Sequence, residues 1–443
     1  MADTVNTREL VLDILLDVTK RGEYSHIAAA NVLEKHQYLD KKDRAFITRM
    51  TEGTLENLIQ LDDIIDQFSK VPVRKMKPVI RCILRSGVYQ ILYMDTVPDA
   101  AACNEAVRLA KKKGFRNLSG FVNGVLRNIN RGKDRIVWPD KEKDPESYLS
   151  IRYSIPEWMI RMWLEEFDCQ LTKEEDLERM EQLLEALSGP APLTIRTNTD
   201  RCTPTELLQK LEAEGVSAVR SNELPYVFHI TGYDHLAALS SFREGLFYIQ
   251  DLSSMLAAEA AAPKEHDFVL DVCAAPGGKA IHIAQLLHGT GHVLARDLTP
   301  YKVNLLHENI QRCRITNMEA QVWDARILDE SYREKADLVI ADLPCSGLGV
   351  MRRKKDIRYK MTPEKIRELA ALQREILTTI HHYVKPGARM IYSTCTISRR
   401  ENEENTQWFL DNHKDFNLRS SRQIFPTIAG GDGFYIAEFQ KKL

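Results

Sequence analysis

The sequence predicts a multidomain protein with three parts: an all-α amino-terminal domain, a small α+β unit and a carboxyl-terminal α/β domain. The chain has 443 residues, which is too long for one ordinary core. Apolar residues recur at helical spacing before residue 131, and from about residue 266 strand-like runs alternate with helical stretches. We place the parts at 1–130, 151–260 and 261–443, with a linker at 131–150.

The first part is predicted to be helical throughout. Its apolar periodicity is carried by ELVLDILLDVT, AFITRMTEGTLENLIQLDDIIDQF, PVIRCILRSGVYQILYM and FVNGVLRNI. The periodicity lapses in RGKDRIVWPDKEKDPESYLS, where charge and proline take over, so we expect a linker there.

The second part begins with two more helical segments, SIPEWMIRMWLEEF and EEDLERMEQLLEAL. Short strands are then expected at PLTIRTNT, PYVFHITG and GLFYIQD, around a helix at TPTELLQKLEAEG. This combination indicates a small α+β unit.

The third part contains five β-rich runs separated by helical stretches. They are FVLDVCA, HVLARDL, EAQVWDA, ADLVIADL and ARMIYSTC. Such alternation is typical of a parallel sheet with helices on both faces, and ligands of these sheets bind at the carboxyl ends of the strands.

Composition excludes several classes of protein. Hydrophobic residues make up 44% and charged residues 28% of the chain, as in a soluble globular protein. No apolar run approaches the roughly 18 residues of a membrane span, and MADTVNTREL lacks a signal peptide's pattern, so we expect a cytoplasmic protein without membrane contact. The 8 cysteines show no C-x-x-C pair, which predicts reduced thiols and no metal site.

Residues that follow the predicted strands indicate a nucleoside ligand. CAAPGGK follows the first strand, where Gly277 and Gly278 permit a tight turn against a ligand. Asp297, Asp324 and Asp342 end the next strands, and a carboxylate at Asp297 can accept both hydroxyls of a ribose. Because the turn lacks the spaced glycines that a pyrophosphate requires, S-adenosylmethionine is the expected ligand.

Two cysteines lie at carboxyl ends of predicted strands. Cys345 follows ADLP, and Cys395 ends ARMIYSTC. The C5 carbon of a pyrimidine accepts a methyl group only after a thiolate has added to C6, which calls for nucleophilic catalysis. Loss of the C5 proton afterwards calls for a base and a second group nearby.

Three stretches carry a specific resemblance. LDVCAAPGGK (270–279), ADLPCSGLG (341–349) and YSTCTISRRENEEN (392–405) resemble the RNA 5-methylcytosine methyltransferases of the RsmB/Sun/Fmu and Nop2 group. The resemblance covers the carboxyl-terminal half, and the first domain is similar to the NusB fold that bacterial members carry. It implies a Rossmann-like methyltransferase domain, a bacterial small-subunit (16S) ribosomal RNA substrate and S-adenosylmethionine as cofactor. We expect a monomer.

The resemblance also assigns site residues. It implies that Cys395 is the nucleophile, that Cys345 assists product release, and that Asp342 lies between the cofactor and the base. It places Asp297 at the ribose and Asp324 at the adenine. Lys302 replaces a frequent arginine, and Ala280 a frequent threonine. The implied cofactor set is Cys273, Ala274, Ala275, Pro276, Gly277, Gly278, Lys279, Asp297, Lys302, Asp324 and Asp342.

Basic residues indicate where RNA binds. Residues 71–135 hold 14 Lys and Arg against 4 Asp and Glu, which suits phosphate contacts, although a solvated helix face explains the excess equally well. In the α+β unit, LTIRTNT offers two more polar candidates, and MRRKKDIRYK (351–360) forms a possible phosphate clamp. The candidates are Lys111, Lys112, Lys113, Arg116, Arg127, Arg196, Asn198, Arg352, Arg353 and Lys354.

Three other classes of protein remain as alternatives. A DNA cytosine-5 methyltransferase would use Cys345 as nucleophile and leave Cys395 unexplained. A nucleotide-dependent oxidoreductase would share Asp297 but has no need of two thiols. A noncatalytic RNA-binding factor would account for the helical domain and not for the paired cysteines.

Overall fold

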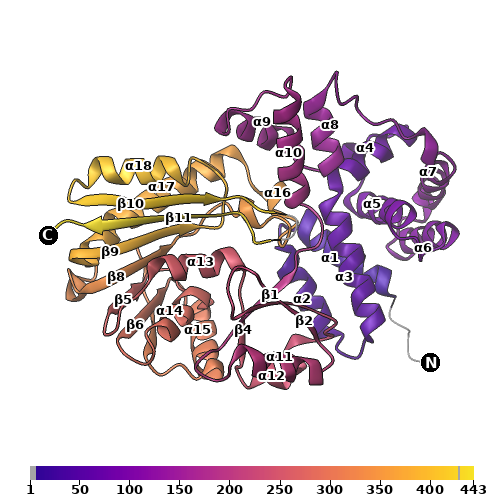
Figure 1. The fold of residues 1–443 in the computed structure, drawn as a ribbon. Helices are drawn as coiled ribbons and strands as arrows, with labels where there is room; N and C mark the ends of the chain where they lie inside the picture. The colour runs from indigo at the N-terminus through magenta and orange to yellow at the C-terminus, as the bar shows by residue number, and fades with distance from the viewer. Residues whose placement is uncertain (1–5, 428–429) are drawn as a thin grey trace. The chain divides into compact units, whose positions relative to one another are not determined.

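The computed structural model describes residues 6–427 and 430–443, and it divides into two compact units (Figure 1). Unit 1 comprises residues 1–189 and 351–360, and unit 2 comprises residues 190–350 and 361–443. The expectation that MADTVNTREL is no signal peptide falls partly on residues 1–5, which lie outside the described residues. Among the described residues, no helix is both long and apolar enough to cross a membrane.

Unit 1 is helical in every described regular element, which confirms the all-α prediction. Asn6 caps the first helix by accepting a hydrogen bond from the Arg8 backbone at 3.0 Å, and Asp40 caps the third. Its helices are α1 (Thr7–Thr19), α2 (Ser25–Lys35), α3 (Lys41–Glu56), α4 (Leu58–Phe68), α5 (Pro78–Tyr93), α6 (Asp99–Lys112), α7 (Ser119–Arg131), α8 (Pro145–Tyr153), α9 (Glu157–Glu166), α10 (Glu174–Ala186) and α16 (Ile357–Lys360).

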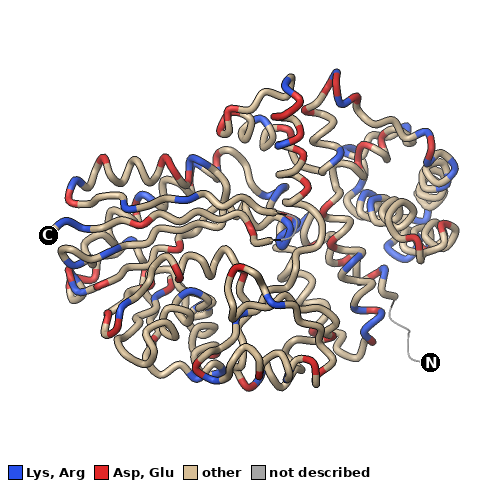
Figure 2. Tube along the Cα trace, viewed as in Figure 1, with Lys and Arg blue, Asp and Glu red and all other residues tan. Residues whose placement is uncertain are grey.

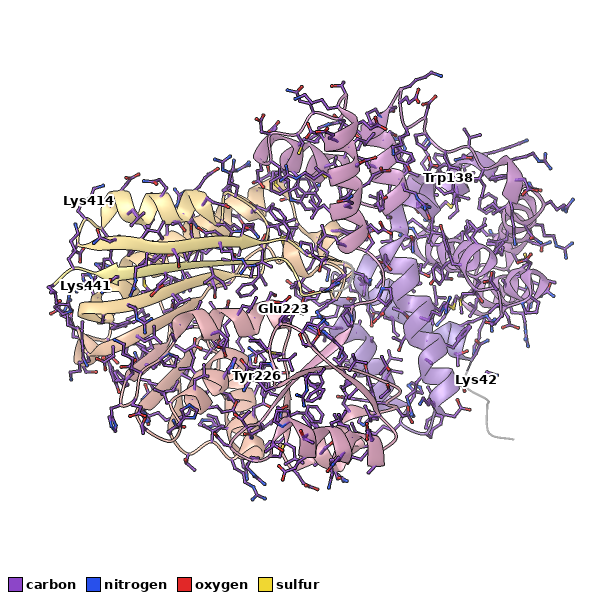
Figure 3. All side chains as sticks on the ribbon, in the orientation of Figure 1. Lys42, Trp138, Glu223, Tyr226, Lys414 and Lys441 are labelled. Atoms are coloured by element: carbon purple, nitrogen blue, oxygen red, sulfur yellow. The ribbon has the colours of Figure 1, made fainter. Side chains whose placement is uncertain are left out.

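The expected linker is only partly irregular. Residues 136–144 carry no helix or strand, but α8 begins at Pro145, and α8 to α10 are grouped with the amino-terminal helices. Trp138, labelled in Figure 3, is 41% exposed in this stretch. The helical grouping therefore runs to Gly189, farther than the change in composition indicated.

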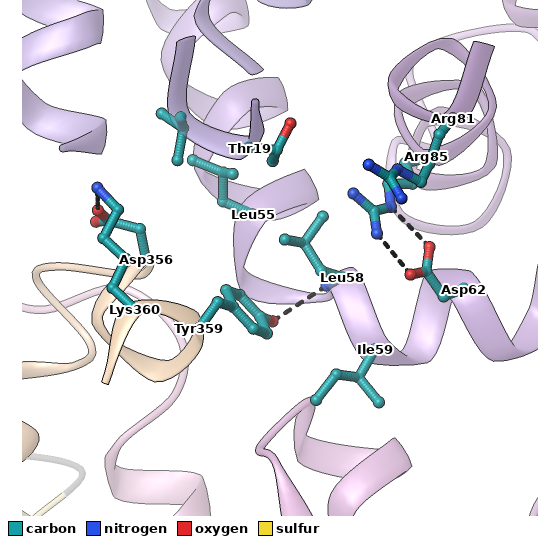
Figure 4. Close-up of a pocket in the computed structure, with 11 residues that line it drawn as sticks. Thr19, Leu55, Leu58, Ile59, Asp62, Arg81, Arg85, Asp356, Tyr359 and Lys360 are labelled. Atoms are coloured by element: carbon teal, nitrogen blue, oxygen red, sulfur yellow. Dashed lines mark hydrogen bonds and ion pairs between the residues drawn. The ribbon is translucent and has the colours of Figure 1, made fainter. Parts of the chain in front are cut away.

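Unit 1 encloses a pocket of about 290 Å³ (Figure 4). Its centre is apolar, with Leu55, Leu58 and Ile59, and Arg85 forms an ion pair with Asp62 at one end at 2.5 Å. The Tyr359 hydroxyl accepts a hydrogen bond from the Leu58 backbone at 3.2 Å. None of the predicted catalytic or cofactor residues lines this pocket.

Unit 2 begins with a four-stranded antiparallel sheet in the order β2-β3-β1-β4. A capping box, in which Thr203 and Glu206 cap each other's backbone, starts its main helix. The elements are β1 (Leu193–Thr197), α11 (Pro204–Ala213), β2 (Ser217–Arg220), β3 (Val227–Thr231), α12 (Ser240–Arg243) and β4 (Phe247–Ile249). The predicted α+β unit is confirmed, with β2 as an additional strand.

The rest of unit 2 is a seven-stranded sheet in the order β10-β11-β9-β8-β5-β6-β7. The five predicted strands are parallel, whereas β11 pairs antiparallel with β9 and β10 pairs antiparallel with β11. The sheet is thus mixed, and the expectation of a parallel sheet was incomplete. The strands are β5 (Phe268–Asp271), β6 (His292–Asp297), β7 (Met318–Val322), β8 (Ala336–Asp342), β9 (Val384–Thr394), β10 (Phe416–Ile424) and β11 (Phe434–Lys441).

Helices cover both faces of this sheet (Figure 1). One face packs on α13 (Leu252–Ala261), α14 (Gly278–Leu286) and α15 (Pro300–Cys313), and the other on α17 (Pro363–Ile380) and α18 (Glu403–Asn412). The strand order reverses between β5 and its neighbours β6 and β8, which is where a ligand crevice is expected in such sheets.

Candidate active site

The turn after β5 brings a glycine-rich backbone to the carboxyl edge of the sheet. Gly277 adopts a φ of 112°, which side chains rarely tolerate, and Gly278 begins α14. The Pro276 carbonyl accepts hydrogen bonds from the Tyr248 hydroxyl at 3.0 Å and from the Asn309 amide at 3.1 Å. These contacts fix the turn that leads into the helix.

Asp297 ends β6 beside this turn. Its carboxylate is 3% exposed and accepts hydrogen bonds from the backbone of Ala275 at 3.0 Å and of Leu298 at 2.7 Å. Lys302, whose side chain is 51% exposed, places its Nζ 3.0 Å from Oδ1. A carboxylate has about four lone-pair positions, so a ligand that displaced this exposed lysine would find acceptors here.

Asp342 ends β8 and connects three elements. Its Oδ2 lies 2.7 Å from the Lys279 ammonium of α14, and its Oδ1 accepts a hydrogen bond from the Ser393 hydroxyl of β9 at 2.8 Å. Lys279 also donates to the Ser254 hydroxyl at 2.8 Å. The predicted glycine turn and the predicted acidic strand end are therefore joined by a partly buried ion pair.

Asp271, at the end of β5, was not singled out from the sequence. It is 1% exposed, its Oδ1 accepts a bond from the Cys273 backbone at 3.3 Å, and its Oδ2 has no partner among the described residues. Burial, followed by the charge of Asp342, raises the pKa of Asp271 to about 8. Its position before the glycine turn, like that of Asp297 and Asp342 at their strand ends, is the signal that could have revealed it.

The two predicted thiols meet at the ends of neighbouring strands. Cys345 follows β8, Cys395 follows β9, and their sulfur atoms are 3.3 Å apart. Both residues are partly exposed and neither forms a disulfide. The hydrogen bond with Cys395, followed by burial, raises the pKa of the Cys345 thiol well above its ordinary value.

The remaining predicted cofactor residues lie at the same edge or near it. Asp324 follows β7 and forms a two-pronged ion pair with Arg326, with Nη2 to Oδ2 at 2.7 Å. This pairing lowers the pKa of Asp324, so its carboxylate is charged, and both of its oxygens already bind Arg326. Cys273 lies in the turn after Asp271, and burial raises the pKa of its thiol.

The two polar candidates in LTIRTNT, Arg196 on β1 and Asn198 just after it, are buried inside the protein. Arg196 is 2% exposed and donates to the side chains of Gln250 and Gln285. Asn198, also 2% exposed, donates to the carbonyls of Gly245 and Cys313. Both residues were predicted to contact RNA; in the structure their side chains are buried, and they donate to the Gln285 side chain of α14 and to the Cys313 carbonyl at the end of α15.

The tract 351–360 also differs from the expected phosphate clamp. Arg352 is 2% exposed, and Lys355 forms an ion pair with Glu56 at 2.8 Å inside unit 1. Arg358 is fully buried and donates to the carbonyls of Glu56, Tyr153 and Leu187. Of the candidates named in this tract, Arg353 and Lys354 retain exposed surface.

The basic cluster of unit 1 lies on α6, α7 and the turn between them, where blue positions gather in Figure 2. Lys112 and Lys113 form ion pairs with Glu9 and Asp13 of α1. The other members are exposed: Lys111, Arg116 and Arg127.

Three models of protein families match the chain. They are described as 16S rRNA methyltransferase RsmB/F over residues 258–440, NusB family over residues 5–131, and the ferredoxin-like domain of RsmF/B-like methyltransferases over residues 155–233. They coincide with the sheet that carries the thiols, with the amino-terminal helices and with the segment that ends in the small sheet.

Full-length relatives have similar sequences. A probable ribosomal RNA small subunit methyltransferase B of Bacillus subtilis is 35% identical over 455 residues, covering 99% of both chains. The ribosomal RNA small subunit methyltransferase B of Proteus mirabilis is 30% identical, covering 100% of both.

Solved structures share the fold. One superimposes on 99% of both chains with a TM-score of 0.82 at 25% identity. A methyltransferase homologue from Pyrococcus horikoshii is 26% identical with a TM-score of 0.57, covering 66% of this chain and 97% of its own.

Proposed function

Since the chain belongs to the RsmB/F family of 16S rRNA methyltransferases, we propose that it transfers a methyl group from S-adenosylmethionine to C5 of a specific cytosine in small-subunit ribosomal RNA. The transfer proceeds through a covalent bond between the Cys395 sulfur and C6 of the base. The observation that carries the proposal is the pair of thiols, with sulfur atoms 3.3 Å apart beside Asp342 at adjacent strand ends.

The residues at the ends of β5 and β6 fit this cofactor. Asp297 would accept hydrogen bonds from the two ribose hydroxyls once Lys302 moves aside. Asp271 contributes a buried oxygen without a partner among the described residues. When bound, S-adenosylmethionine supplies an electrophilic methyl group.

The two thiols take different roles. C5 and C6 are neighbouring atoms, so groups that act on them must lie within a few ångströms of each other, as these sulfurs do. By the family resemblance, Cys395 makes the attack on C6, for which its thiolate form is needed. Cys345 then assists the loss of the C5 proton and the departure of Cys395.

The RNA must present an accessible base. A cytosine inside a helix cannot reach a thiol at a sheet edge, so the target is unpaired or flipped out. We assign phosphate contacts to the exposed residues of the α6–α7 cluster, Lys111, Arg116 and Arg127.

A labelling experiment tests this function. The full chain is incubated with methyl-labelled S-adenosylmethionine and undermethylated small-subunit ribosomal RNA, either free or within particles. We expect label in 5-methylcytosine at one position, and none with Cys395→Ala. Label in another nucleoside, or no label with either form of the RNA, would overturn the proposal.

A further inference from the structure

Glu401 is a buried carboxylate beside the loop that carries Cys345. It is fully buried, and the residues that donate to its carboxylate, Ser346 and Gln373, are uncharged. Its Oε1 accepts hydrogen bonds from the Ser346 backbone at 2.9 Å and from the Gln373 amide at 3.0 Å, and its Oε2 accepts one from the Ser346 hydroxyl. Burial outweighs these hydrogen bonds and raises the pKa of Glu401.

These contacts fix both neighbours of Cys345. Ser346, on its carboxyl side, is held by Glu401, and the carbonyl of Pro344, on its amino side, accepts a hydrogen bond from Gln373 at 2.9 Å. Gln373 is itself fully buried and accepts bonds from the Tyr392 hydroxyl at 3.1 Å and from the Asn405 amide at 2.7 Å. Cys345 therefore lies between two residues that are both held in place by hydrogen bonds.

Asn402, the next residue, does the same for Cys395. Its Oδ1 accepts a hydrogen bond from the Thr394 hydroxyl at 2.6 Å, and its amide donates to the Thr396 carbonyl at 3.0 Å. Asn402 occupies the N-cap position of α18, where asparagine normally bonds the helix backbone, yet its side chain forms no cap hydrogen bond. It is directed to the two neighbours of Cys395 instead.

The two anchored loops are also joined directly. The hydroxyls of Ser346 and Thr396 lie 2.8 Å apart, and the Gly349 backbone donates to the Cys395 carbonyl at 3.1 Å. Two adjacent residues, Glu401 and Asn402, thus hold the flanks of the two thiols. A shift of either side chain changes the position of one sulfur relative to the other.

We propose that Glu401 and Asn402 are positioning residues that together set the spacing of the two thiols, Glu401 through the flanks of Cys345 and Asn402 through those of Cys395. The positioning part of this proposal rests on the hydrogen bonds described above and not on the chemistry. The use of the spacing in catalysis rests on the proposed function. A displacement of about 1 Å at a reacting group is expected to lower turnover by roughly 100-fold.

The spacing can be measured without RNA or cofactor. Diamide takes two electrons and two protons from a pair of thiols, becomes a hydrazine and leaves one S–S bond, and this step needs the sulfurs to approach bonding distance. The rate at which the full chain forms the Cys345–Cys395 disulfide, followed by mass spectrometry, therefore reports their separation. Cys345→Ser gives the zero reference.

We expect wild type and Glu404→Ala, a control on the exposed surface of α18, to form the disulfide at equal rates. Glu401→Ala and Asn402→Ala should each be at least about tenfold slower, because an unanchored loop samples many positions. Glu401→Gln, which keeps one acceptor oxygen, should be intermediate. If Glu401→Ala does not fold, Ser346→Ala carries the same comparison. Wild-type rates in the folded variants would overturn the proposal.

A second experiment, with RNA added, distinguishes the role of Glu401 from that of Asn402. Glu401→Ala should accumulate covalent enzyme–RNA adduct, as expected when Cys345 cannot assist release, whereas Asn402→Ala should form less adduct than wild type. Equal adduct in the two variants would contradict separate roles. If the disulfide rates change as expected but no variant, Cys345→Ala included, forms adduct, then the positioning stands and the covalent mechanism fails.

Discussion

At the scale of single residues, three carboxylates meet at one edge of the larger sheet, and each is held in a different state. Asp342 forms an ion pair with Lys279, Asp297 accepts backbone hydrogen bonds, and Asp271 keeps an oxygen without a partner among the described residues. The sequence predicted the first two from their strand ends. The raised pKa of Asp271 depends on burial and on the nearby charge of Asp342. Neither can be read from the spacing of residues in the sequence.

Asp297→Ala should weaken S-adenosylmethionine binding by about 1.5–3 kcal/mol, the usual contribution of hydrogen bonds to a charged group. Calorimetry with the full chain measures this. Asp337→Ala is a suitable control, because Asp337 lies at the opposite end of β8, where it pairs with Lys385. An affinity equal to that of the control would remove Asp297 from the cofactor site.

Asp271→Asn should change how stability depends on pH. The folded protein keeps the Asp271 proton up to about pH 8, whereas an unfolded chain releases it near 3.9. The folded state therefore binds more protons between these values, and wild-type stability falls as pH rises through them. The variant lacks this loss, so its melting temperature relative to wild type should increase from pH 5 to pH 9. Parallel melting curves would contradict the raised pKa.

At the scale of elements, the sequence identified the parallel strands and most helices but missed β10, β11 and β2. β10 is exposed at six of its nine positions along FNLRSSRQI, and β2 at three of its four along SAVR, so neither shows the alternation that predicts a strand. These exposed strands form because a neighbouring strand pairs with their backbone, β11 with β10 and β3 with β2. The contacts of Arg196, Asn198 and Arg358 were missed for a related reason, since a basic or polar residue is usually exposed.

The close approach of two loops near the thiols also depends on packing. Gly349 donates to the Cys395 carbonyl and accepts from the Gly433 backbone at 2.9 Å, and a Cβ on Gly349 would lie 2.0 Å from the Gly433 carbonyl oxygen. Gly349→Ala must therefore push the loop that follows Cys345 away from the Gly433 backbone just before β11.

We expect Gly349→Ala to lower the rate of methyl transfer by roughly 100-fold. Affinity for S-adenosylmethionine should stay unchanged, since Asp297 and the glycine turn are not touched. Single-turnover kinetics and calorimetry separate the two effects. Gly120→Ala, at a glycine with open space around it, is the control. Loss of cofactor affinity together with rate would indicate general unfolding of the site instead.

At the scale of the whole molecule, residues 351–360 belong to the helical unit although they follow the Cys345 loop in the chain. In the sequence this tract is a run of charged residues, which is normally typical of an exposed segment. Its burial could not be predicted, because its partners Glu56, Tyr153 and Leu187 are distant along the chain.

Charge reversal tests whether the α6–α7 cluster binds RNA. Lys111→Glu with Arg116→Glu should weaken RNA binding and reduce the salt slope by about 0.7 to 0.9 for each phosphate that the protein no longer neutralises. The matched control is Lys41→Glu with Lys42→Glu, an exposed pair at the start of α3 in the same unit. Equal salt slopes for the two double variants would show that the cluster is only a solvated helix face.

The central claim is that two neighbouring thiols act in order on one cytosine, and trapping of the enzyme on RNA tests it most directly. Each variant is incubated with S-adenosylmethionine and undermethylated small-subunit ribosomal RNA, then separated by denaturing electrophoresis. Cys345→Ala should methylate the RNA and remain joined to it through Cys395, whereas Cys395→Ala should give neither methylation nor adduct. An adduct with Cys395→Ala and none with Cys345→Ala would contradict the account and make Cys345 the nucleophile.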